Sequence, residues 1–538
     1  METSKDFIAQ GQAVLGIELG STRIKAVLIG ADYAPIASGG YSWENKLENG
    51  LWTYDLQTAE AGLQEAFRSL VENVNREYGV ALETVRAIGI SGMMHGYLPF
   101  DSQGSQLAPF RTWRNTVTEK ASAILTEKFD FNIPQRWSIS HLYQAILQKE
   151  EHVGRIAFIT TLAGYIHWRL TGEKIVGISE GSGMFPVDSS TGDYDQDMLR
   201  IFSDTIAPEG YAWQAKDILP RIGRAGEEAG VLTAEGAKLL DPTGHLQAGI
   251  PLCPPEGDSG TGMVATNSVA RNSGNISAGT SIFATIVLEK PLSRVYKDID
   301  VLASPDGSTV AMIHCTNCTG DLDAWVQLFA QFHALSGGQL TKPQLYDLLY
   351  NTALEAEADG GGLLACNYYS GEHLTGIEQG RPFLIRTPES RFTLPNLMRT
   401  ILFSSIATLK IGLDIITGQE GVVLAQLMGH GGLFQTKHVG QALVAGALNT
   451  PIAVMESAGE GGAWGIALLA AYGQDKKEAE ALAEFLNSKV FIGLNSTCVQ
   501  PAETITQGFA AFMERYKEGL AIERLAVEKL PLEQASHQ

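Results

Sequence analysis

A carboxylate and a small hydroxylated turn lie close together near the middle of the chain. Asp258 stands in the glycine-rich segment EGDSG, and the turn Gly279-Thr280-Ser281 follows it inside an alternating, strand-like run. Phosphoryl transfer needs both kinds of group, because a carboxylate accepts the proton of the attacking hydroxyl and successive backbone N–H groups cradle the phosphate. The pairing therefore predicts a phosphoryl-transfer site around residues 253–283.

A second turn of the same kind occurs near the N-terminus. Residues 17–22 (IELGST) and 276–281 (ISAGTS) share one pattern: apolar, small or polar, apolar, glycine and two hydroxyls. Both are flanked by strand-like sequence, so each predicts a hairpin whose turn can face a phosphate. The repeat favours two related domains that face one nucleotide, although each hairpin taken alone also fits an ordinary turn.

Three further segments carry candidate binding groups. His95 follows Met94 directly after the buried-type strand 85–90, and ligands bind beyond the carboxyl ends of strands in open α/β sheets. Trp113 and Asn115 offer an aromatic face and an amide, which suit a polyol but equally suit a surface loop. The glycine-rich run 429–432 lacks the dinucleotide and Walker patterns, yet its adjacent glycines permit close approach of an adenine.

Length and charge limit the classes of protein. A chain of 538 residues is too long to fold around a single hydrophobic core, so two large domains are expected. The formal charge of −21 is spread without a basic block, which argues against nucleic acid and anionic membrane surfaces as partners. No signal peptide and no apolar run long enough to span a bilayer are found, so we expect a cytoplasmic protein.

The five cysteines are few and odd in number, which argues for a reducing compartment. Cys315 and Cys318 form a C-x-x-C, but no second pair completes a zinc site and no thioredoxin-like unit surrounds it. We therefore expect small buried side chains in preference to a redox or metal function.

The remaining pattern supplies the elements around these groups. Helical spacing occurs over residues 57–79, 322–334, 391–416 and 463–471. Residues 177–195 are rich in turn formers, and the chain after Lys476 is predicted to be helical and charged.

Taken together, six segments resemble the FGGY family of carbohydrate kinases, within the actin-like ATPase superfamily. They occur in the family's order along nearly the whole chain: GIELGSTRIK (16–25), SGMMHG (91–96), EGDSGTGM (256–263), NISAGTS (275–281), LMGHGGLF (427–434) and ESAGEGGAWGIALLAA (456–471). The resemblance implies an α/β fold of two actin-like (ribonuclease H-like) domains, each a mixed β-sheet flanked by helices, with an interdomain active-site cleft. It implies domains over residues 1–268 (sugar and first phosphate motif) and 269–538 (second phosphate and adenosine motifs).

The resemblance also implies roles for individual residues. Asp258 would be the general base, and Glu18 with Asp258 would hold Mg²⁺. Residues that would contact the sugar are Met94, His95, Trp113, Asn115, Asp258 and Ser259. Residues that would bind ATP are Gly20, Ser21, Thr22, Lys25, Gly279, Thr280, Ser281, Gly431 and Gly432. The implied ligands are ATP, Mg²⁺ and a small sugar, with a homodimer as a possible assembly.

The chain departs from the family at three of these positions. Glu18 stands where the family has aspartate, so metal ligation through water is an alternative to direct ligation. Asn115 replaces an acidic residue, and Ser259 stands where xylulokinases usually have asparagine.

The sugar is the least determined feature. The Met-His-Gly motif favours ketopentoses, whereas residues 112–116, 129–147 and 254–269 resemble a divergent branch of L-ribulokinases. We predict phosphorylation of L-ribulose to L-ribulose 5-phosphate, as in arabinose catabolism, with D-xylulose or another sugar or polyol as the alternative. A non-kinase actin-like ATPase and a catalytically inactive sugar sensor are the rivals from other classes.

Overall fold

The computed structural model describes residues 3–436, 438–455, 461–493 and 496–531. The chain forms two compact units. The first unit comprises residues 1–270, 300–310 and 457–493, and the second comprises residues 271–299, 311–456 and 494–538. Both units are discontinuous in sequence, because short segments of the C-terminal half belong to the first.

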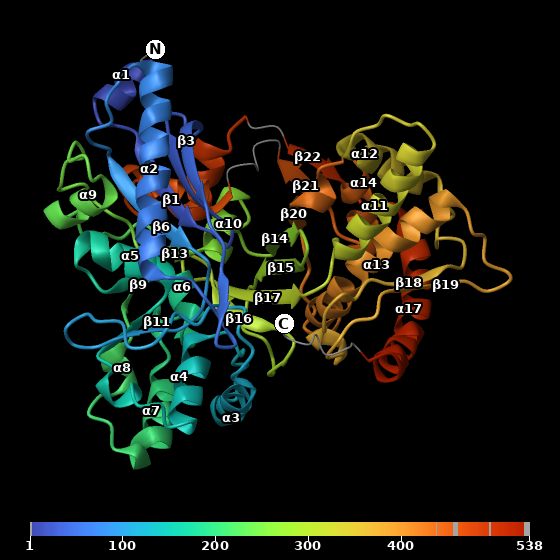
Figure 1. The fold of residues 1–538 in the computed structure, drawn as a ribbon, viewed down its shortest axis with the longest axis horizontal. Helices are drawn as coiled ribbons and strands as arrows, with labels where there is room; N and C mark the ends of the chain where they lie inside the picture. Colours follow the sequence, from blue (N-terminus) through green and yellow to red (C-terminus); the bar gives the residue numbers. More distant parts are fainter. Residues whose placement is uncertain (1–2, 437, 456–460, 494–495, 532–538) are drawn as a thin grey trace. The chain divides into compact units, whose positions relative to one another are not determined.

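The first unit is built on a mixed five-stranded sheet of order β13-β6-β1-β2-β3 (Figure 1). β1 pairs antiparallel with β2 and parallel with β6, and β6 pairs parallel with β13. The bounds are β1 Val14–Leu19, β2 Arg23–Ile29, β3 Pro35–Ser42, β6 Ala87–Gly92 and β13 Glu256–Gly257.

Helices cover both faces of this sheet. α2 (Leu56–Tyr78) packs on β2 and β3, and Leu15 and Ile17 of β1 belong to the same buried core. Gly16 points to the opposite face, because side chains alternate along a strand. There a side chain on Gly16 would collide with Ala463 and Ala467 of α15 (Gly461–Asp475), so this glycine permits the close approach of helix and strand.

The second unit repeats this arrangement, with strands in the order β17, β15, β14, β20, β21, β22. β14 pairs antiparallel with β15 and parallel with β20, as β1 pairs with β2 and β6. The bounds are β14 Ser273–Ala278, β15 Ile282–Val287, β17 Thr309–Cys315, β20 Gln426–His430, β21 Ile452–Met455 and β22 Ser496–Val499. The two hairpins predicted from the sequence therefore occupy matching positions in two mixed sheets.

The helix predicted over residues 391–416 is confirmed, but the expectation that no apolar run is long enough to span a bilayer is wrong. The segment Leu394–Gln419, which begins with α13 (Leu394–Asp414), is long and apolar enough to cross a membrane. Two thirds of its most apolar 18-residue stretch is buried inside the structure, as in the core helix of a globular unit. Its buried residues pack with α14 (Val439–Leu448) and α17 (Glu503–Lys529).

All five cysteines are free. Cys315, at the end of β17, and Cys318 are buried in the core of the second unit. Within the described ranges, no group of three or more His, Cys, Asp or Glu side chains could hold a metal ion. The burial of Cys315 and Cys318 agrees with the expectation of small buried side chains.

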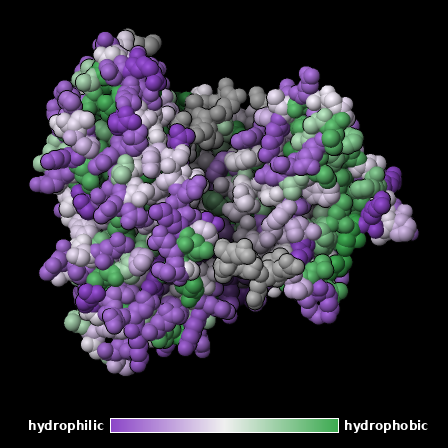
Figure 2. Space-filling view, viewed as in Figure 1, coloured by the Kyte–Doolittle hydropathy of each residue, from purple (hydrophilic) through white to green (hydrophobic). Residues whose placement is uncertain are grey.

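The surface of the second unit includes exposed apolar side chains on α11 (Gly320–Leu335). Leu328, Phe332 and Leu335 repeat at helical spacing and are all more than half exposed. Figure 2 shows apolar surface over this part of the unit. These three apolar side chains therefore form an exposed strip along one side of α11.

His141, on α4 (Ser138–Leu147), predicts a pH-dependent stability of the first unit. Its ring is fully buried, neither ring nitrogen has a hydrogen-bond partner among the described residues, and burial lowers its pKa from 6.5 to about 3. The unfolded chain therefore binds a proton that the folded chain does not between these values. Stability should fall as the pH drops from 6.5 towards 3, by roughly 3–5 kcal/mol for this group.

Urea unfolding at a series of pH values checks this prediction. The variant His141→Phe keeps a ring against Tyr97 and should flatten the acid limb of the stability curve. His245→Phe, on the exposed surface, is the matched control and should keep the wild-type slope. An unchanged slope in His141→Phe would show that the buried imidazole does not govern acid lability.

Candidate active site

Three parallel strands of the first unit end at one edge of its sheet. Leu19 of β1 is level with Gly92 of β6, and Gly92 is level with Gly257 of β13. The segments that follow these strands begin with Gly20, Met93 and Asp258. Because ligands bind beyond the carboxyl ends of strands in such sheets, this edge is the candidate site of the first unit.

Asp258 follows β13, the outermost of these three strands. It is the first residue of α10 (Asp258–Ala265), its side chain is exposed, and one carboxylate oxygen accepts the backbone N–H of Met94 at 3.2 Å. The densely packed protein around the carboxylate raises its pKa above the usual aspartate range, although the Met94 N–H opposes this shift. Asp258 thus combines access to a ligand with a fixed orientation, as a general base requires.

Met94 and His95 form the neighbouring wall and are both buried. His95 adopts the left-handed conformation with φ of 72°, which is uncommon outside glycine. The ring Nδ1 lies 3.2 Å from the carbonyl oxygen of Gly183, and the ring stacks on Trp137 at a centroid distance of 6.3 Å. The orientation of His95 is therefore set from two sides.

Glu18 lies at the same edge, where β1 ends. Its carboxylate packs against Gly462 and accepts the backbone N–H of Ala463 in the first turn of α15. Burial and the nearby Asp258 carboxylate raise its pKa to about 7, while Lys25, directly opposite on β2, acts in the other direction. Two acids that repel each other in this way fit Mg²⁺, which kinase sites hold through one or two carboxylates and the phosphates.

The first hydroxylated turn joins β1 to β2. Ser21 and Thr22 are at least partly accessible, and the Gly20 N–H is tied to the Arg23 carbonyl oxygen at 3.0 Å. The turn is therefore an ordered hairpin end at the same sheet edge as Asp258. Ser259, the second residue of α10, is buried with 8% of its surface exposed.

Two acids near Asp258 were not predicted to belong to the site. Glu180 of α6 (Ile178–Ser182) is fully buried, with the Thr161 side chain near its carboxylate. It packs directly against Gly257, and burial raises its pKa well above the usual glutamate range. Glu256 accepts the N–H groups of Ser179 and Glu180 at 3.4 and 2.8 Å, and burial raises its pKa to about 8.

These two acids hold α6 against the segment that precedes Asp258. Glu256 occupies the space left by the missing side chain of Gly177, and Glu180 occupies the corresponding space at Gly257. The glycine Gly257 precedes Asp258 and was visible in the sequence. Glu180 carried no sequence signal, because it lay in a segment predicted to be turn-rich.

Trp113 and Asn115 follow Arg111, which pairs with Tyr97 just beyond His95. The Asn115 side-chain oxygen accepts the Trp52 N–H at 2.8 Å, and its amide nitrogen donates to the carbonyl oxygens of Trp52 (2.8 Å) and Thr112 (3.0 Å). Among the described residues, all hydrogen bonds of the Asn115 side chain go to these two neighbours. Asn115 thus fixes the loop that carries Trp113, which is half-buried.

The second unit brings its two predicted nucleotide segments together. β14 and β20 are parallel, and Ser277 is level with His430, so Gly279–Ser281 and Gly431–Gly432 leave the same edge. A side chain on Gly431, whose φ is 99°, would collide with the Ala278 carbonyl oxygen. In contrast, the side-chain position of Gly279 is open, with the nearest atom 4.0 Å away. An edge with glycine and open space fits the close approach of a nucleotide.

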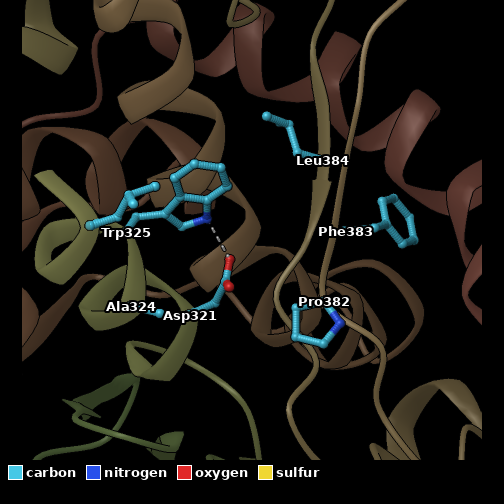
Figure 3. A pocket seen from close by; sticks show the side chains of 7 residues that line it. Asp321, Ala324, Trp325, Pro382, Phe383 and Leu384 are labelled. Carbon is cyan, nitrogen blue, oxygen red and sulfur yellow. Dashed lines mark hydrogen bonds between the residues drawn. The ribbon is translucent and has the colours of Figure 1, made fainter.

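Outside these groups, a cavity of about 210 Å³ lies on the second unit between α11 and residues 382–384 (Figure 3). Trp325 donates its indole N–H to the Asp321 carboxylate at 3.1 Å at this cavity. None of the residues predicted to bind sugar or nucleotide lines it. Residues 456–460, part of the predicted C-terminal signature, lie outside the described residues.

Comparison with known proteins agrees with this architecture. The N-terminal domain of the FGGY family of carbohydrate kinases matches residues 13–264, and its C-terminal domain matches residues 274–474. The xylulose kinase of Haemophilus influenzae is 22% identical over 500 residues, which cover 89% of this chain and 96% of that protein.

Solved structures share the fold at lower identity. The xylulose kinase of Rhodospirillum rubrum superimposes with a TM-score of 0.78 at 16% identity, over 96% of this chain and 100% of that one. The gluconate kinase of Lactobacillus acidophilus gives 0.76 at 17% identity, over 96% and 99%. Kinases named for different sugars thus share these two units of mixed sheet and flanking helices. With both family domains matched along most of its length, the chain belongs to the FGGY family of carbohydrate kinases.

Proposed function

We propose that the chain transfers the γ-phosphoryl group of ATP to the terminal hydroxyl of a ketopentose. The observation that carries the proposal is the exposed Asp258 carboxylate, oriented by the Met94 N–H at the carboxyl-end edge of the first sheet. Membership of a carbohydrate kinase family supports the reaction class.

Asp258 acts as the general base in this proposal. The terminal hydroxyl oxygen attacks the γ-phosphorus in line, its proton passes to Asp258, and the bond from the γ-phosphorus to the bridging oxygen of ADP breaks. Asp258 must be ionised for this step, so its raised pKa predicts loss of activity as the pH falls through that value. Met94, His95, Trp113, Asn115 and Ser259 are proposed to contact the sugar.

Nucleotide binding is assigned to both hairpin turns. Gly20, Ser21, Thr22 and Lys25 in the first unit, and Gly279, Thr280, Ser281, Gly431 and Gly432 in the second, are proposed to bind ATP. Glu18 and Asp258 are the proposed residues for Mg²⁺. The metal ion, when bound, neutralises the phosphate charge, which the chain's net charge of −21 would otherwise repel.

The sugar is proposed as a ketopentose with two leading candidates. L-ribulose is favoured because the sequences of residues 112–116, 129–147 and 254–269 resemble a divergent branch of L-ribulokinases. This substrate would place the enzyme in arabinose catabolism. D-xylulose is supported at least as well, because the Haemophilus influenzae relative is named a xylulose kinase. Epimeric ketoses differ by one or two hydrogen bonds, so loop geometry around His95 decides between them.

The setting of the enzyme is also a proposal. Free cysteines throughout the chain support a reducing, cytoplasmic location. We still predict two kinase domains, over residues 1–268 and 269–538. Assembly of the chain into a homodimer also stays a prediction. A non-kinase actin-like ATPase and an inactive sugar sensor are the alternatives that the following assay separates.

Release of ADP across a panel of ketopentoses, ketohexoses and glycerol tests the proposal. We expect turnover above the sugar-free rate with D-xylulose or L-ribulose and little with glycerol. ATP hydrolysis of equal rate with and without every sugar would favour the non-kinase ATPase. Sugar binding without turnover would favour the sensor.

A further inference from the structure

The two hydroxylated turns share a pattern of hydrogen bonds to their backbone carbonyl oxygens. In each turn, backbone carbonyl oxygens accept hydrogen bonds from groups outside the hairpin, and these groups belong to unrelated parts of the chain. The donors are Trp43 and Tyr54 in the first unit, and residues 318–319 in the second.

All three carbonyl oxygens of the first turn are bound. The Trp43 indole Nε1–H donates to Gly20 at 2.7 Å, and the Trp43 backbone N–H donates to Thr22 at 3.1 Å. The Tyr54 hydroxyl donates to Ser21 at 2.6 Å. Trp43 and Tyr54 are buried, and their rings pack at a centroid distance of 4.3 Å. Burial raises the pKa of Tyr54 to about 12, so the phenol keeps its proton at neutral pH.

Two carbonyl oxygens of the second turn likewise accept hydrogen bonds from outside the hairpin. Gly279 accepts the Thr319 N–H at 3.1 Å and the Thr319 hydroxyl at 2.9 Å. Thr280 accepts the Cys318 N–H at 2.9 Å. The C-x-x-C segment therefore supports this turn with its backbone.

Residues deeper in the second unit hold that supporting segment. Glu372 accepts the N–H groups of Thr316 (2.9 Å) and Asn317 (3.3 Å), and it has no exposed surface. The Asn317 side-chain oxygen accepts the N–H groups of Tyr369 (2.9 Å) and Ser370 (3.0 Å). The segment that leads to Thr319 is therefore fixed by hydrogen bonds from buried groups.

The peptide geometry gives these bonds a direction. In a trans peptide unit the C=O and the N–H of the next residue point to opposite sides, and the described residues contain no cis peptide bond. Carbonyl oxygens held inward at Gly20 and Ser21 turn the N–H groups of Ser21 and Thr22 outward. Those held at Gly279 and Thr280 do the same for Thr280 and Ser281. In the described part of the chain, none of these four N–H groups donates a hydrogen bond to the protein.

We propose that Trp43, Tyr54 and Thr319 are positioning residues that preset both turns, so that outward N–H groups receive the phosphates of the nucleotide. Successive outward N–H groups form an anion-binding concavity. Preorganised donors need no reordering when the anion arrives, which favours binding. The inference rests on the proposed binding of ATP by these turns, and it adds residues that need not touch the nucleotide.

Two conservative variants of the full-length chain test the proposal. Tyr54→Phe removes one hydroxyl and keeps the ring, and Thr319→Val removes one hydroxyl and keeps the shape. The controls remove equivalent bonds elsewhere: Tyr78→Phe loses the bond to the Ile36 carbonyl (2.8 Å), and Thr417→Val loses that to Leu413 (3.0 Å). Calorimetry with ADP in the presence of Mg²⁺ gives the dissociation constant, and kinetics give separate KM values for ATP and sugar.

Tyr54→Phe and Thr319→Val should each weaken ADP binding and raise the KM for ATP roughly three- to tenfold, as expected for one lost hydrogen bond. The KM for sugar and the values of both controls should stay within about twofold of wild type. Unchanged ADP affinity in the two folded variants, or equal weakening in the controls, would overturn the inference. A wild-type chain that does not bind ADP would overturn it as well. A wild type that binds ADP but phosphorylates no sugar would refute the proposed function alone, because the binding comparison still reports on the turns.

Discussion

Asp258→Asn is expected to lower the turnover number by roughly 10²–10⁴-fold, the usual contribution of a positioned general base. The substitution keeps the shape of the side chain and an oxygen that can accept the Met94 N–H, so the loop should retain its geometry. What is lost is the capacity to take the proton of the sugar hydroxyl as it attacks. The KM values for ATP and sugar should therefore change far less than kcat.

Steady-state kinetics with the preferred ketose check this expectation. Asp197→Asn, on the exposed surface of α7 (Gln196–Ile206), is the matched control and should behave as wild type. In the wild type, kcat/KM should decline as the pH falls through the raised pKa of Asp258, and the residual activity of the variant should lack this limb. An Asp258→Asn enzyme with near-wild-type turnover would remove Asp258 from the role of base.

Gly279→Ala is expected to weaken nucleotide binding about tenfold or more, at least 1.4 kcal/mol, without unfolding the second unit. The added methyl group would meet no described atom closer than 4.0 Å, and Gly279 is not among the residues with positive φ. The folded protein therefore tolerates alanine here. A phosphate seated on the open side of this turn would not, because the methyl group occupies the space through which the backbone is approached.

The matched control is Gly418→Ala, where the side-chain position is also open and the backbone is equally compatible. Thermal unfolding should give both variants melting temperatures close to wild type, and only Gly279→Ala should lose affinity for ADP. Equal ADP affinity in the two variants would place the phosphate away from Gly279. A collapse of stability in Gly279→Ala would contradict the open geometry of the turn.

Much of the fold could be predicted because local pattern and tertiary structure agree. The hairpins around Gly20 and Gly279 combine β-branched strands with small hydroxylated turns, and both occur in the structure. The parallel strands that follow them place Asp258 at the same sheet edge as the first turn, and Gly431 at the same edge as the second. Separation in sequence is no obstacle here, because the parallel strands of each sheet share a carboxyl-end edge.

Other features depend on contacts that no local pattern reports. Residues 496–499 form the strand β22 within a region predicted to be helical, since their strand state comes from pairing with β21. Glu180 is buried through the space at Gly257, and turn-forming neighbours concealed its short helix. Tyr54 reaches Ser21 across the fold through one hydroxyl group, a relation that spacing cannot reveal.

The most direct test of the proposed reaction is to follow the phosphorus atom itself. Wild-type protein incubated with ATP, Mg²⁺ and either D-xylulose or L-ribulose should yield a sugar phosphomonoester in phosphorus NMR, with one ADP formed for each ester. Asp258→Asn should form the same ester far more slowly. Formation of ADP and inorganic phosphate with no sugar ester, from either ketose, would contradict the assignment of this chain as a ketopentose kinase.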